Sequence, residues 1–132
     1  MAEVKFGFIG TGNMGSALVR ALRKTVPGHE VVLSNRTALK AQTLAKELKC
    51  RAADNKTVAK EAQYIFLGVK PQMMKAMLDG ITDSLAERTD RFVLVTMAAG
   101  ITTDSINEML GAKYPIIRIM PNTPVAIGEG VV

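Results

Sequence analysis

Short runs of apolar residues alternate along this chain with longer segments in which apolar residues recur at helical spacing. The runs predict six strands, expected at Val4–Ile9, Val31–Ser34, near Arg51–Ala53, and at Tyr64–Gly68, Phe92–Met97 and Ile116–Met120. Several of them are apolar at nearly every position, which is typical of strands that are covered on both faces. Strands that alternate with helices predict βαβ units, and therefore an α/β fold with a mainly parallel sheet and helices on both faces.

Five helices are predicted between these strands. The first carries an apolar stripe made of Met14, Ala17, Leu18, Ala21 and Leu22. The others are expected at Thr37–Lys49, at Asn55–Ala62, around the cluster Met73, Met74, Met77 and Leu78, and at Thr102–Leu110. We interpret the methionine cluster as a buried stripe rather than a flexible binding surface. Thr102 and Gly111 are residue types that commonly begin and end a helix.

The first strand runs into a glycine-rich turn, Gly10-Thr-Gly-Asn-Met-Gly15, which opens the first helix. In such a G-x-G-x-x-G turn, Gly10 allows the tight bend, Gly12 leaves room for a pyrophosphate, and Gly15 lets the helix pack closely on the strand. Free backbone N–H groups at the start of the helix favour an anion. Because a strand precedes the motif and a helix follows it, the sequence favours dinucleotide binding and a doubly wound, Rossmann-like fold.

The turn after the second strand bears on which dinucleotide is bound. An NAD-binding version of this fold places an Asp or Glu there to hold the ribose 2′-OH. The turn here reads Ser34-Asn35-Arg36-Thr37 and contains no acid, and Glu30 lies at the other end of the strand. An arginine with neighbouring hydroxyl and amide donors suits a 2′-phosphate, although the same residues also suit a turn and a helix cap. We therefore expect NADPH as the cofactor, with NADH as the alternative.

Composition agrees with one ordinary globular domain, since 48% of the 132 residues are hydrophobic and 22% are charged. No apolar run approaches the about 18 to 20 residues of a membrane span, and the N-terminus lacks the pattern of a secretory signal. The one cysteine, Cys50, cannot form an internal disulfide, which fits a reducing cytoplasm. We expect Cys50 to be half-buried at a strand start and His29 to be exposed. A cytoplasmic protein with no metal site and no membrane partner is therefore expected.

The net charge of +5 is unevenly distributed, because residues 1–70 hold 12 Lys and Arg against 5 Asp and Glu, and residues 71–132 hold 5 against 7. A basic half fits either nucleic-acid binding or a solvated face beside an anionic cofactor. The lysines have no aromatic residues between them that would form a stacking platform for bases. We therefore expect a solvated face and no nucleic-acid partner.

Three further segments follow strands at the edge where open α/β sheets bind ligands. Leu67–Gln72 contains Lys70, a residue that can reach a phosphate or a carboxylate, and Pro71, which shapes the turn into the next helix. Thr96–Thr102 is rich in small residues, which allow a flat ring to approach the backbone. Met120–Pro124 holds an Asn-Thr pair between two prolines, which stiffen the turn. Each segment taken alone is equally compatible with a surface lysine, helix packing or a rigid loop.

Together these segments resemble the N-terminal domain of pyrroline-5-carboxylate reductase. The resemblance runs over essentially all 132 residues and is carried by Phe8–Ala17, Val69–Gln72, Ala98–Thr102 and Met120–Pro124. The last of these, followed by Gly128-Glu-Gly130, is the most specific, because many dehydrogenases share the glycine motif. The resemblance implies an oxidoreductase that uses NAD(P)H to reduce the C=N bond of 1-pyrroline-5-carboxylate to L-proline, the last step of proline biosynthesis.

The resemblance also implies roles for individual residues. The adenosine half of the cofactor would be held by the glycine turn, the Ser34–Arg36 turn and Asn55. Val69, Lys70 and Ala99 would line the nicotinamide side. The full cofactor-binding set is Gly10, Thr11, Gly12, Asn13, Met14, Gly15, Ser34, Asn35, Arg36, Asn55, Val69, Lys70, Pro71, Ala99 and Gly100. Lys70, Asn122 and Thr123 would be positioning residues near the reacting carbon.

In this family a second, helical domain forms a dimer and contributes the pocket for the substrate carboxylate, and the sequence contains no such helices. The chain stops in the strand-like run Gly128–Val132. We therefore expect residues 1–132 to be an NADP-binding domain cut at or near a domain boundary. Such a domain would bind NADPH with little or no reductase activity, and the full-length protein would form a homo-oligomer.

Two other functions fit the residues. Another NADP-dependent reductase on the same fold, of the β-hydroxyacid or prephenate dehydrogenase type, is expected to carry different residues after the last strand. A non-catalytic NADP-sensing module would bind NADPH and never oxidise it in the presence of substrate.

Overall fold

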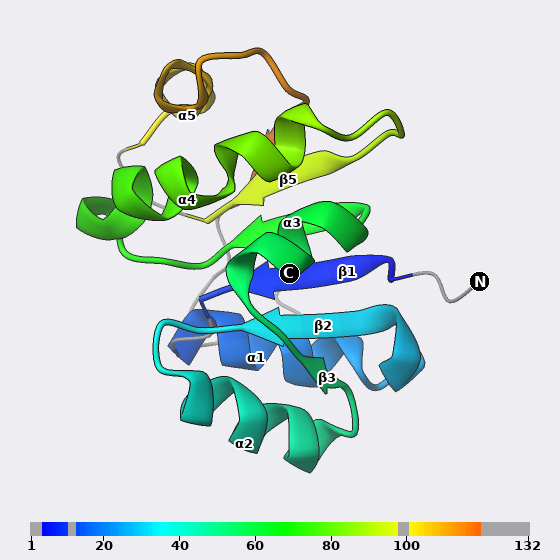
Figure 1. The fold of residues 1–132 in the computed structure, drawn as a ribbon. Coiled ribbons are helices and arrows are strands. Elements are labelled where there is room, and N and C mark those ends of the chain that lie inside the picture. Colours follow the sequence, from blue (N-terminus) through cyan, green and yellow to red (C-terminus); the bar gives the residue numbers. More distant parts are fainter. Residues whose placement is uncertain (1–3, 11–12, 98–100, 120–132) are drawn as a thin grey trace.

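The computed structural model of the 132-residue chain describes residues 4–10, 13–97 and 101–119, with the side chains of residues 13 and 14 excepted. Within these residues, six strands form one sheet in the order β3-β2-β1-β4-β5-β6 (Figure 1). The strands are β1 Phe6–Ile9, β2 Val31–Ser34, β3 Arg51–Ala52, β4 Tyr64–Leu67, β5 Val93–Thr96 and β6 Ile116–Arg118. Every neighbouring pair is parallel, so the predicted parallel sheet is confirmed.

Helices cover both faces of this sheet (Figure 1). The helices are α1 Asn13–Leu22, α2 Ala38–Leu48, α3 Asn55–Glu61, α4 Met74–Ala86 and α5 Thr103–Leu110, with short 3₁₀ turns at Gly28–Glu30 and Pro71–Met73. α1 and α2 pack on one face, and α3, α4 and α5 pack on the other. This is the Rossmann-like, doubly wound α/β architecture predicted from the alternation of strands and helices.

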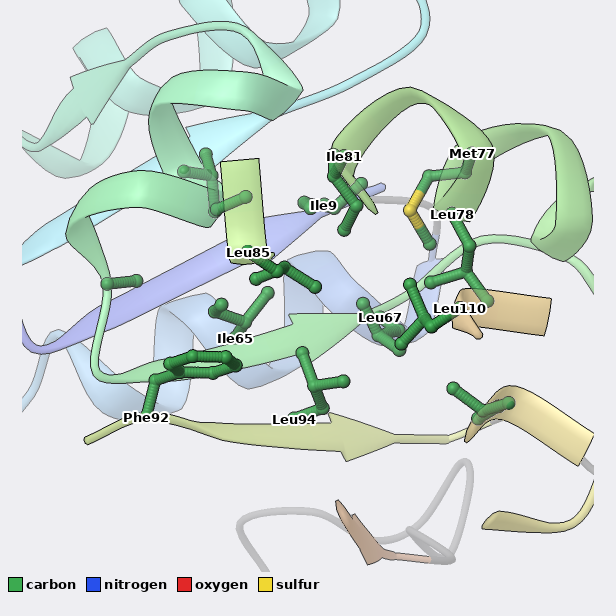
Figure 2. Packing of buried hydrophobic residues seen from close by; sticks show 14 of the residues in the cluster. Ile9, Ile65, Leu67, Met77, Leu78, Ile81, Leu85, Phe92, Leu94 and Leu110 are labelled. Carbon is green, nitrogen blue, oxygen red and sulfur yellow. The ribbon is translucent and has the colours of Figure 1, made fainter. Parts of the chain in front are cut away.

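The alternating sides of a strand explain how one sheet supports two hydrophobic clusters. On β1, Phe8 packs with residues of α1 and α2, whereas the next residue, Ile9, packs with residues of α3, α4 and α5. Figure 2 shows the larger cluster, in which Ile65, Leu67 and Leu94 of the sheet meet the buried face of α4. Its fully buried members are each worth roughly 1.5 to 3 kcal/mol in transfer free energy.

The methionine cluster belongs to this core. Met74 is fully buried, Met77 is 8% exposed, and Leu78 is fully buried beside them, so the predicted buried stripe is confirmed. Met73 is only partly buried, since it ends the 3₁₀ turn that precedes α4.

The helix ends follow the predicted caps. Thr102 accepts a hydrogen bond from the Ser105 backbone amide at 3.1 Å, and Gly111 ends α5 with a φ of 72°. Thr37 and Lys49, which were predicted as the first and last residues of a helix, are instead the residues that flank α2, and Lys49 adopts a left-handed φ of 58°. Such one-residue differences arise because a capping residue is only half helical.

The chain leaves β1 toward β2 on one side and later returns to β4 on the other. β1 is therefore the place where the strand order reverses, which is where open α/β sheets bind ligands. The registers pair Ile9 with both Ser34 and Leu67, so the carboxyl ends of β1, β2 and β4 reach the same edge. The strand arrows in Figure 1 point toward this edge, which we call the carboxyl edge.

Candidate functional site

Three glycines meet where β1 ends, α1 begins and β4 ends. Gly10 has a φ of +88°, and a Cβ on it would lie 2.9 Å from the Gly68 backbone. A Cβ on Gly68 would lie 2.5 Å from the Gly10 carbonyl oxygen, and one on Gly15 would lie 2.8 Å from the same oxygen. The predicted backbone roles of Gly10 in the tight turn and of Gly15 in close helix packing are therefore confirmed. Gly68 was not predicted, because only the pairing of β1 with β4 brings it to the turn.

Backbone hydrogen bonds hold these ends in register beyond the strands themselves. The Gly10 amide donates to the Ser34 carbonyl at 2.8 Å, and the Gly68 amide donates to the Ile9 carbonyl at 2.8 Å. The end of β1 is thereby fixed to the end of β2 on one side and to the residue that follows β4 on the other.

A side-chain contact joins the end of β2 to the start of α3. Ser34 is 1% exposed, and its hydroxyl donates to Oδ1 of Asn55. Asp54 caps α3, since its Oδ1 accepts a hydrogen bond from the Thr57 amide at 2.8 Å. Hydrogen bonds from the Thr57 side chain and backbone lower the pKa of Asp54, so its carboxylate is ionised at neutral pH. Ser34 and Asn55, predicted as neighbours on a ligand, are thus held side by side.

A cavity of about 490 Å³ lies over the point where the strand order reverses, and we call it the inner cavity. Gly10 and Gly68, which follow β1 and β4, line this cavity. Arg36, Asn55 and Lys70 also line it. Lys70 precedes the 3₁₀ turn, where its carbonyl accepts a hydrogen bond from the Met73 amide at 2.8 Å. Its side chain is exposed, as is that of Pro71, which does not line the cavity.

A second cavity of about 710 Å³ lies beyond β2, among α2, the end of β3 and the start of α3. We call it the outer cavity. It shares Asn35, Arg36 and Asn55 with the inner cavity, and Lys56 lines only the outer one. Arg36 is exposed and forms no hydrogen bond or ion pair with the described residues. The acid-free turn after β2 therefore lies between two concave surfaces.

The described structure brings together most of the predicted site residues that it covers. Gly10, Gly15, Ser34, Asn35, Arg36, Asn55, Val69 and Lys70 all lie at the carboxyl edge. Asn13 and Met14 begin α1, but their side chains are not described. Thr11, Gly12, Ala99, Gly100, Asn122 and Thr123 lie outside the described residues, so their predicted roles stay predictions.

Several lining residues were not singled out from the sequence. Lys40 of α2, Met73 and Met77 line the inner cavity, and Gln42 and Lys56 line the outer one. Helical spacing marks Met77 as a core residue and the lysines as solvated, and nothing in that spacing indicates that they border a cavity.

The remaining candidate groups lie elsewhere. His29 is in the 3₁₀ turn before β2, at the opposite edge, with 69% of its side chain exposed. Cys50 is half-buried and unpaired just before β3, as predicted, and burial raises the pKa of its thiol. Among the described residues, no group of three His, Cys, Asp or Glu could hold a metal ion. None of the helices in the described part of the chain is long and apolar enough to cross a membrane.

Comparison with known proteins adds an independent line of evidence. Residues 5–100 match the model of a protein family described as "NADP oxidoreductase coenzyme F420-dependent". Among curated relatives, the pyrroline-5-carboxylate reductase of Escherichia coli (strain K12) is 37% identical over 132 residues, which cover 97% of this chain and 48% of the relative. The chain thus spans about half the length of the curated relatives that it matches.

Solved structures agree with this similarity. A pyrroline-5-carboxylate reductase from Coxiella burnetii superposes with a TM-score of 0.84 at 29% identity, covering 94% of this chain and 46% of that one. The Plasmodium falciparum pyrroline carboxylate reductase with NADP bound superposes with a TM-score of 0.75 at 27% identity, covering 97% and 46%. The resemblance predicted from the motifs is confirmed.

Proposed function

The chain belongs to the family of NADP oxidoreductases matched by residues 5–100, and from this premise we propose that it is the NADPH-binding part of a pyrroline-5-carboxylate reductase. The observation that carries the cofactor assignment is the carboxyl edge itself. There a side-chain-free junction of three glycines adjoins an acid-free turn whose arginine, Arg36, has no ion-pair partner among the described residues. The substrate assignment is supported by the 37% identity to a relative of that name.

The glycine junction fits a dinucleotide because Gly10 and Gly15, at the two ends of the glycine turn, carry no side chain. A methyl group on Gly10, Gly15 or Gly68 would collide with neighbouring backbone, so the close packing here requires residues without a side chain. A pyrophosphate then meets main-chain amides at the start of a helix rather than side chains. In this proposal the turn from Gly10 to Gly15, including Thr11, Gly12, Asn13 and Met14, holds the pyrophosphate.

The turn after β2 supports the choice of NADPH over NADH. Asn35 and Arg36 offer an amide and a guanidinium beside the buried Ser34, whose hydroxyl donates to Asn55. The turn itself holds no acid, and the carboxylate that lines the adjoining outer cavity is that of Asp54, which caps α3. A guanidinium binds phosphate oxygens in a bidentate manner that a carboxylate would oppose. We assign the 2′-phosphate to this turn and Asn55 to the adenosine ribose beside it.

Bound NADPH supplies a hydride to the carbon of the substrate C=N bond. In our proposal, Val69, Lys70 and Ala99 lie along the nicotinamide side, and Asn122 and Thr123 lie near the reacting carbon. Pro71 and Gly100 complete the proposed cofactor-binding residues. The protein's contribution is then to hold the two reactants together and to exclude water. No strong acid is required of these residues, because a protonated imine is already electrophilic.

We further propose that the complete enzyme is a homo-oligomer in the cytoplasm whose second, helical domain binds the substrate carboxylate. The unpaired Cys50 supports the reducing compartment. The coverage of only about half of each relative supports a second domain in the complete enzymes.

The direct test measures turnover of 1-pyrroline-5-carboxylate with NADPH by two proteins. One is this 132-residue chain, and the other is the chain fused to the second half of the Escherichia coli relative. We expect both to bind NADPH, the chain alone to turn over slowly, and the fusion to form proline at a rate within about tenfold of the relative. A fusion that binds NADPH but leaves 1-pyrroline-5-carboxylate unreduced would contradict the proposal and favour a cofactor-sensing module. Faster oxidation of a β-hydroxyacid or of prephenate with NADP⁺ would favour the other reductases.

Cofactor choice is tested by Arg36→Ala. Loss of a charge-assisted contact to a phosphate costs about 1.5 to 3 kcal/mol, so the Kd for NADPH should rise roughly tenfold or more while that for NADH stays nearly constant. Titration with nicotinamide fluorescence measures both values. Arg91→Ala, an exposed arginine just before β5 at the opposite edge, is the matched control. Equal losses for NADPH and NADH would remove the assignment of the 2′-phosphate to Arg36.

A further inference from the structure

The charges around the outer cavity do not suffice for a phosphate if Arg36 is the only cation. Among the described residues lining this cavity, the charged ones are Arg36, Lys56 and Asp54. Arg36 and Asp54 alone would cancel, which leaves no net attraction for a 2′-phosphate that carries close to two negative charges. Lys56 restores a net positive charge.

Resting on the proposed function, we propose that Lys56 is the second cation of the 2′-phosphate site and that it sets, with Arg36, the preference for NADPH over NADH. Neither the resemblance to the reductase family nor the acid-free turn assigns a role to this residue. Its place in the first turn of α3, next to Asn55, is what brings it to the cavity.

The lysines at this edge line different cavities: Lys56 lines the outer one, and Lys40 and Lys70 line the inner one. The ribose that carries the 2′ position is held at the end of the second strand in this fold, and here the residues of that turn border both cavities. The inner cavity continues toward Gly10 and Gly68, so the pyrophosphate and nicotinamide are expected on that side, near Lys40 and Lys70. The 2′-phosphate branches away from the pyrophosphate, and the outer cavity is the space left for it. Lys56 is the lysine that lines this space and not the other.

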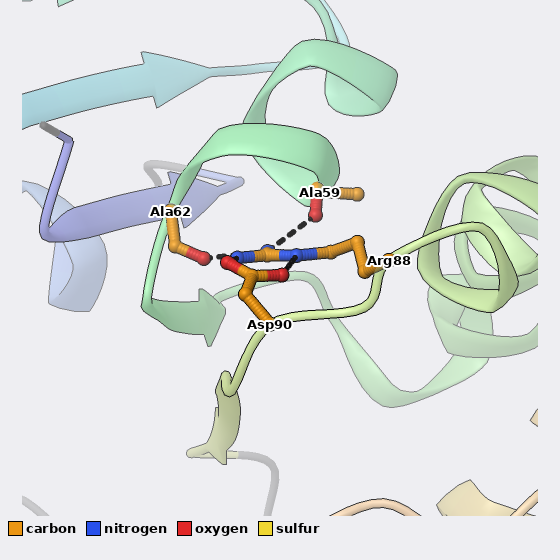
Figure 3. A network of polar contacts seen from close by, with 4 residues as sticks. All are labelled: Ala59, Ala62, Arg88 and Asp90. Carbon is orange, nitrogen blue, oxygen red and sulfur yellow. Dashed lines mark hydrogen bonds and ion pairs between the residues drawn. The ribbon is translucent and has the colours of Figure 1, made fainter. Parts of the chain in front are cut away.

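α3 holds the Lys56 backbone in place from both ends. At its start, Asp54 accepts the hydrogen bond from the Thr57 amide. At its end, Nη1 of Arg88 donates to the carbonyls of Ala59 at 2.8 Å and Ala62 at 2.6 Å (Figure 3). The Lys56 side chain itself is exposed and forms no hydrogen bond with the described residues. Its ammonium is thus carried by a fixed element, where its charge also helps to lower the pKa of Asp54, and it keeps its hydrogen-bond donors for a ligand.

The test compares Kd values for NADPH and NADH in Lys56→Gln, Lys56→Arg and Lys60→Gln, with Arg36→Ala measured alongside. Lys60 is the matched control, since it lies one turn further along the same helix, is exposed, and lines neither cavity. We expect Lys56→Gln to raise the Kd for NADPH about fivefold and to leave that for NADH unchanged, as is typical for loss of one exposed charge pair. Lys56→Arg, which keeps the charge, should bind NADPH nearly as tightly as the unmodified chain. The difference between the Kd values of Lys56→Gln and Lys60→Gln for NADPH should become smaller at high salt, because salt screens the charge of Lys56.

The outcomes separate this inference from the proposed function. If the unmodified chain does not bind NADPH, the proposed function fails. If it prefers NADPH and Arg36→Ala loses that preference, but Lys56→Gln behaves like Lys60→Gln, only the role of Lys56 is overturned. Equal weakening of NADPH and NADH by Lys56→Gln would place the lysine on a part shared by both cofactors and would also overturn it.

Discussion

At the scale of single residues, the most constrained positions of the site are those that carry no side chain. A Cβ on Gly15 or Gly68 would meet the Gly10 carbonyl oxygen, and a Cβ on Gly10 would meet the Gly68 peptide. Gly10 alone of the three has a positive φ, so it is required by conformation as well as by space. The other two are required because any Cβ would be placed against backbone, which cannot move aside as a flexible side chain does.

Gly68→Ala tests this constraint. Its Cβ would lie 2.5 Å from the Gly10 oxygen, so β4 and the glycine turn must separate, at a cost of roughly 1 to 3 kcal/mol in the free energy of unfolding. NADPH affinity should fall as well, because the turn that holds the pyrophosphate moves. Chemical denaturation and cofactor titration of the same variant measure the two effects.

Gly80→Ala is the matched control for the stability effect alone, because Gly80 itself lines the outer cavity. Gly80 lies within α4, and a Cβ there would have no atom within 4 Å. Alanine should therefore stabilise the protein by about 0.5 to 1 kcal/mol through better helix propensity. A Gly68→Ala variant as stable as the unmodified chain would show that the backbone around Gly10 and Gly68 moves apart at little cost, which would contradict the prediction.

At the scale of elements, α3 is the short helix on which the outer cavity depends. Val58 and Ala59 pack it into the larger core, and polar contacts satisfy the backbone at both of its ends. Arg88 follows α4, is 5% exposed at its side chain, and uses all three guanidinium nitrogens. It bonds the last carbonyls of α3, pairs with Asp90, and lies 4.6 Å from the centroid of the Phe92 ring. The Ala59 carbonyl needs this partner because the Gln63 amide, four residues on, donates to Lys5 instead.

Arg88→Met should therefore lower the free energy of unfolding by about 2 to 3 kcal/mol, since it leaves buried carbonyls without a donor. Arg91→Met changes a nearby exposed arginine in the same way and should shift stability by less than about 0.5 kcal/mol. Thermal or denaturant unfolding of the two variants gives the comparison. Similar values for both would mean that water replaces the guanidinium at no cost.

The ion pair between Arg88 and Asp90 makes the stability of the protein depend on pH. Hydrogen bonds from Arg88 hold the pKa of Asp90 below its usual value of 3.8. A carboxyl whose pKa is lowered by folding contributes stability above its unfolded pKa, and this contribution is lost as the pH falls through the folded value. The unmodified chain should therefore lose stability more steeply below pH 3.8 than Arg88→Met does, because only the former has the ion pair to lose.

At the scale of the whole molecule, one sheet carries two cores and one functional edge. The smaller core under α1 and α2 supports the glycine turn and the turn after β2, and the larger core under α3, α4 and α5 supports Asn55 and Lys70. A ligand at the carboxyl edge therefore touches elements packed on both faces of the sheet. Of the 12 Lys and Arg in residues 1–70, four line the cavities at this edge, namely Arg36, Lys40, Lys56 and Lys70. They would attract an anionic cofactor.

The sequence by itself determined the elements, the fold class, the glycine turn and the acid-free turn. These features are local, because strand and helix periods, caps and turn chemistry act within a few residues and need no distant partner. The expected ends of strands were less accurate: the run Val4–Ile9 contributes only Phe6–Ile9 to the sheet. Strand ends depend on which neighbours are available for pairing, and that is not a local property.

Only the tertiary structure decided which distant residues meet. Gly68 became part of the glycine junction because β4 pairs with β1, and Lys56 reached the outer cavity because α3 begins beside the end of β2. In the sequence, the first reads as the end of a strand and the second as one of several solvated lysines. Contacts between residues far apart in the chain arise from the packing of whole elements on the sheet, and no pattern of neighbouring residues encodes them one by one.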